Sequence, residues 1–113
     1  MNDIMKYLPD YKTRLFTYGS TLYNPYGHKI DIGWARHEEK HAEQQTEYSL
    51  NRVKPLKPKE RVKEWWQRYL KNWAFRLSQE IPAYRAQYRE YCKVIFDPRE
   101  RAGIAKLLAR TLC

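Results

Sequence analysis

The stretch that decides the fold is KERVKEWWQRYLKNWAFRLSQE, residues 59–80. Its apolar side chains recur every three or four residues, the spacing of one face of an α-helix. They are Val62, Trp65, Trp66, Tyr69, Leu70, Trp73 and Leu77. Most of the other positions are polar. The pattern predicts one amphipathic helix over about 59–80, called the Trp-rich helix below.

Working outward, three further helices are predicted. Residues 34–48 contain no Gly or Pro, and their apolar stripe is thin, so we expect a mostly solvated or partner-bridging helix there. Pro82 should end the Trp-rich helix and open another. Asp97 and Pro98 are typical of an N-cap and a first helical residue. The predicted helices are therefore about 34–48, 59–80, 83–96 and 98–112.

Residues 1–33 have a different character. Aromatic side chains are scattered there among Pro and Gly, and neither the helical nor the strand period persists. We expect an extended arm that lies along a partner protein, because it cannot bury its rings locally. The fold class predicted is all-α, with three to four short helices in residues 34–113 after an extended, irregular, aromatic-rich N-terminal arm.

Composition supports the expectation of a partner. The chain has 113 residues, enough for one domain, and 15% of them are aromatic. The stripe of the Trp-rich helix can pack on the next two helices, but Trp65 and Trp66 point about 100° apart, so one helix face cannot hold both centrally. We expect at least one tryptophan to meet a neighbour outside the fold. We therefore expect aromatic anchors at an interface. The predicted partner-binding residues are Tyr11, Phe16, Tyr18, Tyr23, Tyr26, Trp34, Trp65, Trp66 and Trp73.

The net charge is +9, and the basic excess lies in the C-terminal half. It favours anionic neighbours, such as phosphate, lipid headgroups or an acidic protein face. Glutamates recur among the basic residues at helical intervals, which is typical of a solvated, salt-bridged face more than of a nucleic-acid interface. The predicted basic surface of the Trp-rich helix is formed by Lys63, Arg68, Lys71 and Arg76.

Several classes are excluded by the sequence. The longest stretch without a charged residue, 15–28, is broken by Gly and Pro, so no transmembrane helix is expected. Residues 1–10 lack the pattern of a secretory signal. Two cysteines, Cys92 and Cys113, form neither a disulfide framework nor a metal quartet.

One motif carries a possible chemistry. Residues 37–41 read His-Glu-Glu-Lys-His and match H-E-x-x-H, which on a helix lets two imidazoles share Zn²⁺ while the glutamate activates water. Glu60 or Glu64 would be the third ligand. The flanking sequence is polar, however, and so short a chain has no second lobe to shape a cleft. The favoured interpretation is a polar helix with its histidines beside Trp34 and Tyr48, with no metal, cofactor or catalytic residue.

A family resemblance lies in the C-terminal third. The segments RAQYREY (85–91), DPRERAGI (97–104) and LLAR (107–110) cover about a quarter of the chain. Together they resemble a small accessory subunit of the membrane arm of mitochondrial complex I. That subunit has an R-A-Q…R-E-Y helix, a D-P…R-x-G-I turn and an L-L-x-x-A/R helix. The resemblance implies a non-catalytic subunit at the inner membrane surface that binds neighbouring subunits.

The sequence hypothesis is therefore a structural accessory subunit of a mitochondrial respiratory complex, peripheral to the inner membrane. It would bind other protein subunits through its arm and its Trp-rich helix, with anionic lipid headgroups as a further contact and no small-molecule substrate. The alternative is a mitochondrial or other ribosomal protein whose basic C-terminal helices contact rRNA. A zinc hydrolase is the third hypothesis.

Overall fold

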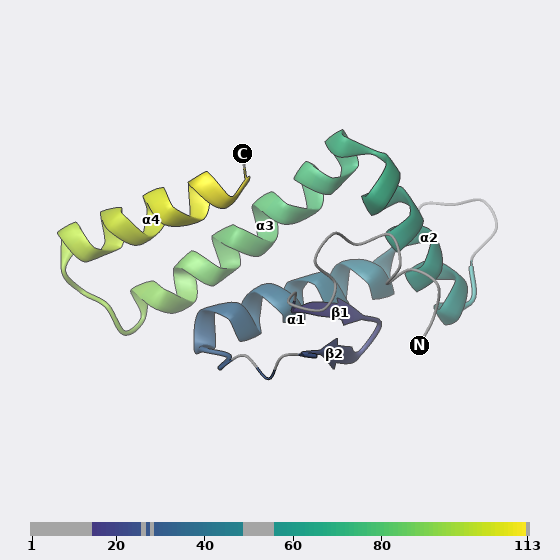
Figure 1. Ribbon diagram of the computed structural model, residues 1–113, viewed down its shortest axis with the longest axis horizontal. Helices are drawn as coiled ribbons and strands as arrows, with labels where there is room; N and C mark the ends of the chain where they lie inside the picture. The colour runs from purple at the N-terminus through teal and green to yellow at the C-terminus, as the bar shows by residue number, and fades with distance from the viewer. Residues whose placement is uncertain (1–14, 26, 28, 49–55, 113) are drawn as a thin grey trace.

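A computed structural model describes residues 15–25, 27, 29–48 and 56–112. These residues form four helices and one β-hairpin, so the predicted all-α class is confirmed (Figure 1). The helices are α1 (Ile32–Glu47), α2 (Pro58–Lys71), α3 (Trp73–Cys92) and α4 (Pro98–Leu112). The strands are β1 (Phe16–Tyr18) and β2 (Thr21–Tyr23).

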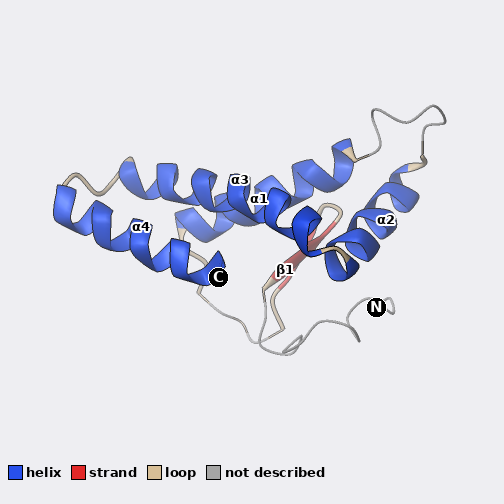
Figure 2. Ribbon diagram, turned by 90° about the horizontal axis from the view of Figure 1, so that it is seen from above, coloured by secondary structure: helices blue, strands red, loops and turns tan. Residues whose placement is uncertain are grey.

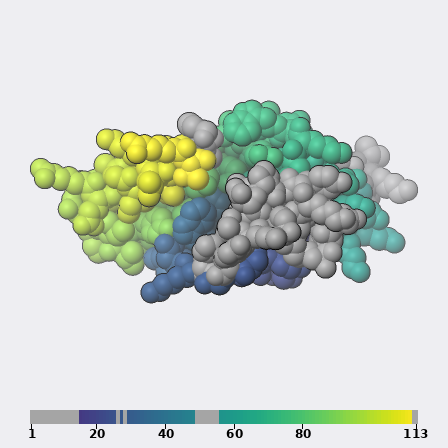
Figure 3. Space-filling view, viewed as in Figure 1, coloured from purple at the N-terminus to yellow at the C-terminus, as the bar shows by residue number. Residues whose placement is uncertain are grey.

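Helix α3 is the centre of the arrangement. Its most extensive contact is with α1, which lies beside it (Figures 1 and 2). Helix α4 runs back along the C-terminal half of α3, and α2 lies at the other end of the molecule (Figure 3). The hairpin packs against α1. The functional question therefore concerns what lies between α1, α3 and the hairpin.

The Trp-rich helix is two helices, and the prediction of one continuous helix is wrong. Asn72 takes an extended conformation (φ −119°, ψ 107°) and separates α2 from α3. Its side-chain oxygen accepts a hydrogen bond from the backbone N–H of Phe75 at 2.9 Å, which makes it the N-cap of α3. The break allows Glu80, on the next helix, to face α1.

The break predicted at Pro82 is also wrong, because α3 continues through this residue. Proline has no N–H to donate to the preceding turn, which usually ends or kinks a helix. Here the following turns are held by tertiary packing, since Ala83, Ala86 and Gln87 are all buried. The helix predicted at 98–112 is confirmed with its bounds.

Residues 16–23 form a hairpin, although no strand is predicted from the sequence. Phe16 pairs with Tyr23, Thr17 with Leu22 and Tyr18 with Thr21. The turn contains Gly19 at φ +64°, a conformation that glycine adopts without strain. Strands of three residues are too short to establish an alternating pattern, so the period could not reveal them.

The hydrophobic core corrects three predicted partner contacts, because Phe16, Trp65 and Trp66 are 4%, 0% and 4% exposed. The two adjacent tryptophans are buried by different parts of the fold. Trp66 contacts Phe16 edge to face, and its Nε1 donates to the backbone oxygen of Thr17. The Nε1 of Trp65 donates to Gln79 on α3 at 2.8 Å. The hairpin therefore buries the second tryptophan that one helix face could not hold.

The other predicted partner residues have different positions. Tyr18, Tyr23 and Trp34 are half-buried, and Trp73 is 61% exposed. Tyr11 and Tyr26 lie outside the described residues. Among the helices that the structure describes, none has both the length and the apolar character needed to cross a bilayer.

Candidate metal centre

Helix α1 is more buried than its composition suggests. His37, Glu38, His41 and Gln45 are all less than one-tenth exposed, so the prediction of a mostly solvated helix is wrong. The physical reason is that three elements pack against α1, namely α3, α2 and strand β1 of the hairpin. A polar helix face can be buried when its groups are hydrogen-bonded.

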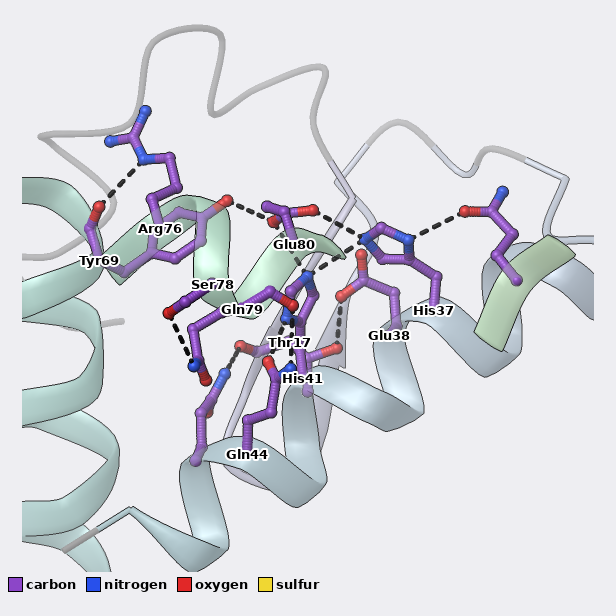
Figure 4. Close-up of polar contacts among 12 residues, drawn as sticks. Thr17, His37, Glu38, His41, Gln44, Tyr69, Arg76, Ser78, Gln79 and Glu80 are labelled. Atoms are coloured by element: carbon purple, nitrogen blue, oxygen red, sulfur yellow. Dashed lines mark hydrogen bonds and ion pairs between the residues drawn. The ribbon is translucent and has the colours of Figure 1, made fainter. Parts of the chain in front are cut away.

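Three ligand-type atoms converge between α1 and α3 (Figure 4). The Nε2 atoms of His37 and His41 lie 3.1 Å apart. Glu80 approaches both, with Oε2 at 3.3 Å from His37 Nε2 and Oε1 at 3.0 Å from His41 Nε2. The carboxylate that joins the two histidines is therefore Glu80, and not Glu60 or Glu64 as the sequence suggested.

The outer nitrogens of the two imidazoles define their protonation. Nδ1 of His37 lies 2.9 Å from Oε1 of Gln87, and Nδ1 of His41 lies 2.8 Å from Oε1 of Gln44. An amide oxygen can only accept a hydrogen bond, so each Nδ1 carries the proton. In the neutral rings, each Nε2 then presents a lone pair toward Glu80.

The charges in the cluster are strongly coupled. Burial alone would raise the pKa of Glu80, but its contacts with His37 and His41 outweigh this and hold the pKa far below its ordinary value. Burial alone would lower the pKa of His41, but the hydrogen bond and charge of Glu80 raise it overall. A positive charge is therefore favoured at this place in the protein.

Glu38, the second residue of the motif, borders the same cluster. Its Oε2 accepts a hydrogen bond from Oγ1 of Thr17 on β1 at 2.7 Å (Figure 4). Burial raises the pKa of the Glu38 carboxyl, and the charges of the two histidines and the Thr17 bond offset this only in part. The hairpin thus supplies the group that holds Glu38.

A third residue outside the motif links the cluster to the core. The hydroxyl of Tyr69 donates to Oε1 of Glu80 at 2.5 Å. The Tyr69 ring stacks on Trp65, with ring centroids 4.9 Å apart. The guanidinium carbon of Arg76 lies over the Tyr69 ring, 4.9 Å from its centroid. Glu80 is therefore oriented by a residue that the core itself fixes.

The predicted neighbours of the histidines are half right. The Trp34 ring lies 5.0 Å from the His37 ring, as expected, whereas Tyr48 packs on Phe75. The second ring beside His37 is Tyr84, at 4.4 Å. The predicted basic residues lie elsewhere: Lys63 and Lys71 are exposed, Arg68 covers Phe75, and Arg76 covers Tyr69.

Comparison with known proteins gave no match, either among protein-family models, among curated proteins or among solved structures. The resemblance to a complex I subunit therefore stays a prediction. Any functional conclusion for this chain has to come from the geometry of its own residues.

Proposed function

We propose that the protein binds one zinc ion through His37, His41 and Glu80 and uses it to hydrolyse an amide or ester bond. The observation that carries the proposal is the convergence of three electron-pair donors at 3.0–3.3 Å. When both rings are neutral, their two lone pairs and the carboxylate repel one another at this separation, whereas at acid pH the proton on His41 relieves part of this repulsion. A cation among them removes the repulsion.

The spacing and the ligand types fit zinc. With bonds of about 2.0 Å, tetrahedral ligand atoms lie roughly 3.3 Å apart, close to the separations observed here. Two imidazoles and one carboxylate suit zinc better than calcium or magnesium, which take mainly oxygen ligands. Three protein ligands leave a fourth position for water, the arrangement of catalytic zinc sites.

Glu38 is the residue that would act on this water. Bound zinc lowers the pKa of its water to about 7. The Glu38 carboxylate would accept a proton from the water as the oxygen attacks the substrate carbonyl. The same proton would pass to the leaving nitrogen or oxygen when its bond to the carbonyl carbon breaks. A carboxyl whose pKa is raised by burial suits this exchange near neutral pH.

Metal analysis tests the site. Purified protein, saturated with zinc and dialysed, should retain one zinc per chain, measured by mass spectrometry of the metal. Glu80→Gln should lose it, because the amide is a poor zinc ligand. The matched control is Glu90→Gln on the same helix, because the Glu90 carboxylate pairs with Lys93 at 2.8 Å. A wild-type protein that retains no zinc would overturn the proposal.

Hydrolysis is tested separately from binding. Glu38→Gln should keep its zinc but lose cleavage of a quenched fluorescent peptide library, or of p-nitrophenyl acetate if esters are preferred. Glu39→Gln is the matched control, because this neighbour is exposed and pairs with Arg36. If the zinc-loaded wild type and Glu38→Gln are equally inactive on both substrates, the hydrolase assignment fails while zinc binding can still hold.

The accessory-subunit hypothesis stays a second proposal. The observation that favours it is the exposure of large rings, with Trp73 61% and Phe96 74% exposed. These residues can serve as anchors on a neighbouring subunit, whereas Trp65, Trp66 and Phe16 are occupied in the core. Recovery of respiratory-complex subunits with the tagged protein from mitochondria would support this proposal, and loss of that recovery on Trp73→Ala would define the contact. Recovery of rRNA instead would favour the ribosomal alternative.

A further inference from the structure

A chain of hydrogen bonds runs from the start of α1 to His37. The hydroxyl of Tyr91 contacts both carboxylate oxygens of Asp31 at 2.9 Å. The amide Nε2 of Gln87 donates to the same hydroxyl oxygen at 3.2 Å. The Oε1 of Gln87 then lies 2.9 Å from Nδ1 of His37. Four side chains, from α1 and α3, therefore connect an exposed carboxylate with a buried imidazole.

The donor and acceptor of every hydrogen bond in this series follow from its first member, the Asp31 carboxylate. An ionised carboxylate only accepts, so Tyr91 must donate its single proton to Asp31. The tyrosine oxygen is then available only as an acceptor, and it selects the NH₂ end of the Gln87 amide. The oxygen end of Gln87 consequently faces His37 and selects the tautomer with the proton on Nδ1.

We infer that Asp31 and Tyr91 are positioning residues that hold His37 in its metal-binding tautomer by fixing the orientation of the Gln87 amide. The inference rests on the proposed function only in naming Nε2 of His37 as a zinc ligand. The tautomer itself is a property of the protein without metal. Hydrogen bonds to the outer nitrogen of a ligating histidine are known to tune metal affinity.

The backbone supports this arrangement at Gly33. A Cβ at this position would lie 2.2 Å from Cζ of Tyr91, so the phenol ring occupies the space that any side chain would take. Gly33 follows the N-cap Asp31 by two residues, and its lack of a side chain brings the hydroxyl of Tyr91 to the carboxylate. The α1 N-terminus is therefore shaped around Tyr91.

His41 supplies an internal comparison. Its Nδ1 contacts Oε1 of Gln44, and the Nε2 of Gln44 donates to the backbone oxygen of Gln79 at 2.9 Å. A backbone carbonyl also only accepts, so it fixes the Gln44 amide in the same sense. The two histidines thus take the same tautomer through separate hydrogen-bond partners. Only the tautomer of His37 depends on Asp31.

The experiment is ¹⁵N NMR of both imidazoles in zinc-free protein, above the pKa values of the rings. In the wild type, His37 and His41 should both show the Nδ1-protonated tautomer. Tyr91→Phe keeps the ring beside Gly33 but removes the hydroxyl. Asp31→Asn keeps an N-cap side chain but can donate as well as accept. In both variants His37 should become a mixture of tautomers, while His41 stays unchanged.

Zinc titration gives the second readout, with an expected loss of affinity of about 10–100-fold in both variants. The matched controls are Tyr88→Phe on α3 and Asp97→Asn, which caps the backbone N–H of Arg99 at the start of α4. Neither should move the tautomer or the affinity. A pure Nδ1-protonated His37 in both variants would overturn the inference, as would a tautomer mixture with unchanged affinity. If both histidines of the wild type show the Nδ1-protonated tautomer but the protein binds no zinc, the proposed metal site is refuted and the inference about the His37 tautomer stands.

Discussion

Zinc should change how the free energy of unfolding of this protein depends on pH. The direction of the change follows from the pKa shifts of Glu38, His41 and Glu80. In metal-free protein the pKa of Glu80 is lowered from 4.5 on folding, so its stabilisation is lost as pH falls below about 4.5. The pKa of His41 is raised from 6.5, so its contribution is complete below 6.5 and is lost as pH rises through the folded value. The raised pKa of Glu38 acts in the same direction as His41.

Metal-free protein should therefore be most stable at acidic pH, just above the range in which the Glu80 contribution is lost, and should lose stability as pH rises through the folded pKa values of Glu38 and His41. Zinc should reverse the alkaline loss, because the ion needs both imidazoles neutral. Its ligands come from α1 and α3, so the unfolded chain has no preformed site. At free zinc 100-fold above Kd, the gain is about 2.7 kcal/mol. For a domain of this size that is an increase in Tm of roughly 10–20 °C.

The assay is thermal unfolding followed by circular dichroism from pH 5 to 9, with buffered zinc and with a chelator. The two curves should coincide near pH 5 and separate as pH rises. Glu80→Gln should show no zinc-dependent separation at any pH. Identical wild-type curves with zinc and with chelator across the whole range would refute the reasoning.

Three further substitutions and one control on α4 test the packing of the fold by urea unfolding. Gly33→Ala should destabilise the fold by about 1–3 kcal/mol, since the new methyl group overlaps the Tyr91 ring. Its control is Gly103→Ala, where no heavy atom lies within 4 Å of the new methyl group, and it should stabilise the fold by about 0.5–1 kcal/mol. A change in unfolding free energy of the same sign in both variants would contradict the geometry. Gln45→Leu should cost about 1–3 kcal/mol, because it leaves the backbone N–H of Gly19 without its partner and removes one of the two hydrogen bonds that the backbone oxygen of Thr17 accepts. A neutral result would mean that the hairpin is held by other contacts. Trp66→Ala should cost about 3–5 kcal/mol through the cavity it leaves, and a loss under 1 kcal/mol would mean that this ring is not in the core.

The parts of the fold that could be predicted are those fixed by local sequence. The helix at 98–112 follows from Asp97 and Pro98, whose capping chemistry depends on no other element. The boundary at Asn72 was missed because the helical period of apolar residues continues across it. A single side-chain cap decides that boundary, and a lone Asn favours a cap without requiring one.

The candidate site could be predicted only to the extent of its motif. The spacing of His37 and His41 was visible, but their burial depends on tertiary packing against Trp65 and Tyr69 of α2 and Tyr84 of α3. Glu80 comes from another helix, and only tertiary packing brings it to the histidines. One signal was available, since Glu80 and Gln87 are seven residues apart and so share one helix face, where both contact His37.

The attachment of the hairpin by Gln45 has a consequence for association with other chains. Its amide nitrogen donates to the backbone oxygen of Thr17, and its oxygen accepts from the backbone N–H of Gly19, at 2.7 and 2.6 Å. One side chain thereby bonds a backbone carbonyl of β1 and a backbone N–H of the turn that follows it. Because the carbonyl of Thr17 is already occupied, a further strand that paired with this edge of β1 would have to displace the Gln45 amide.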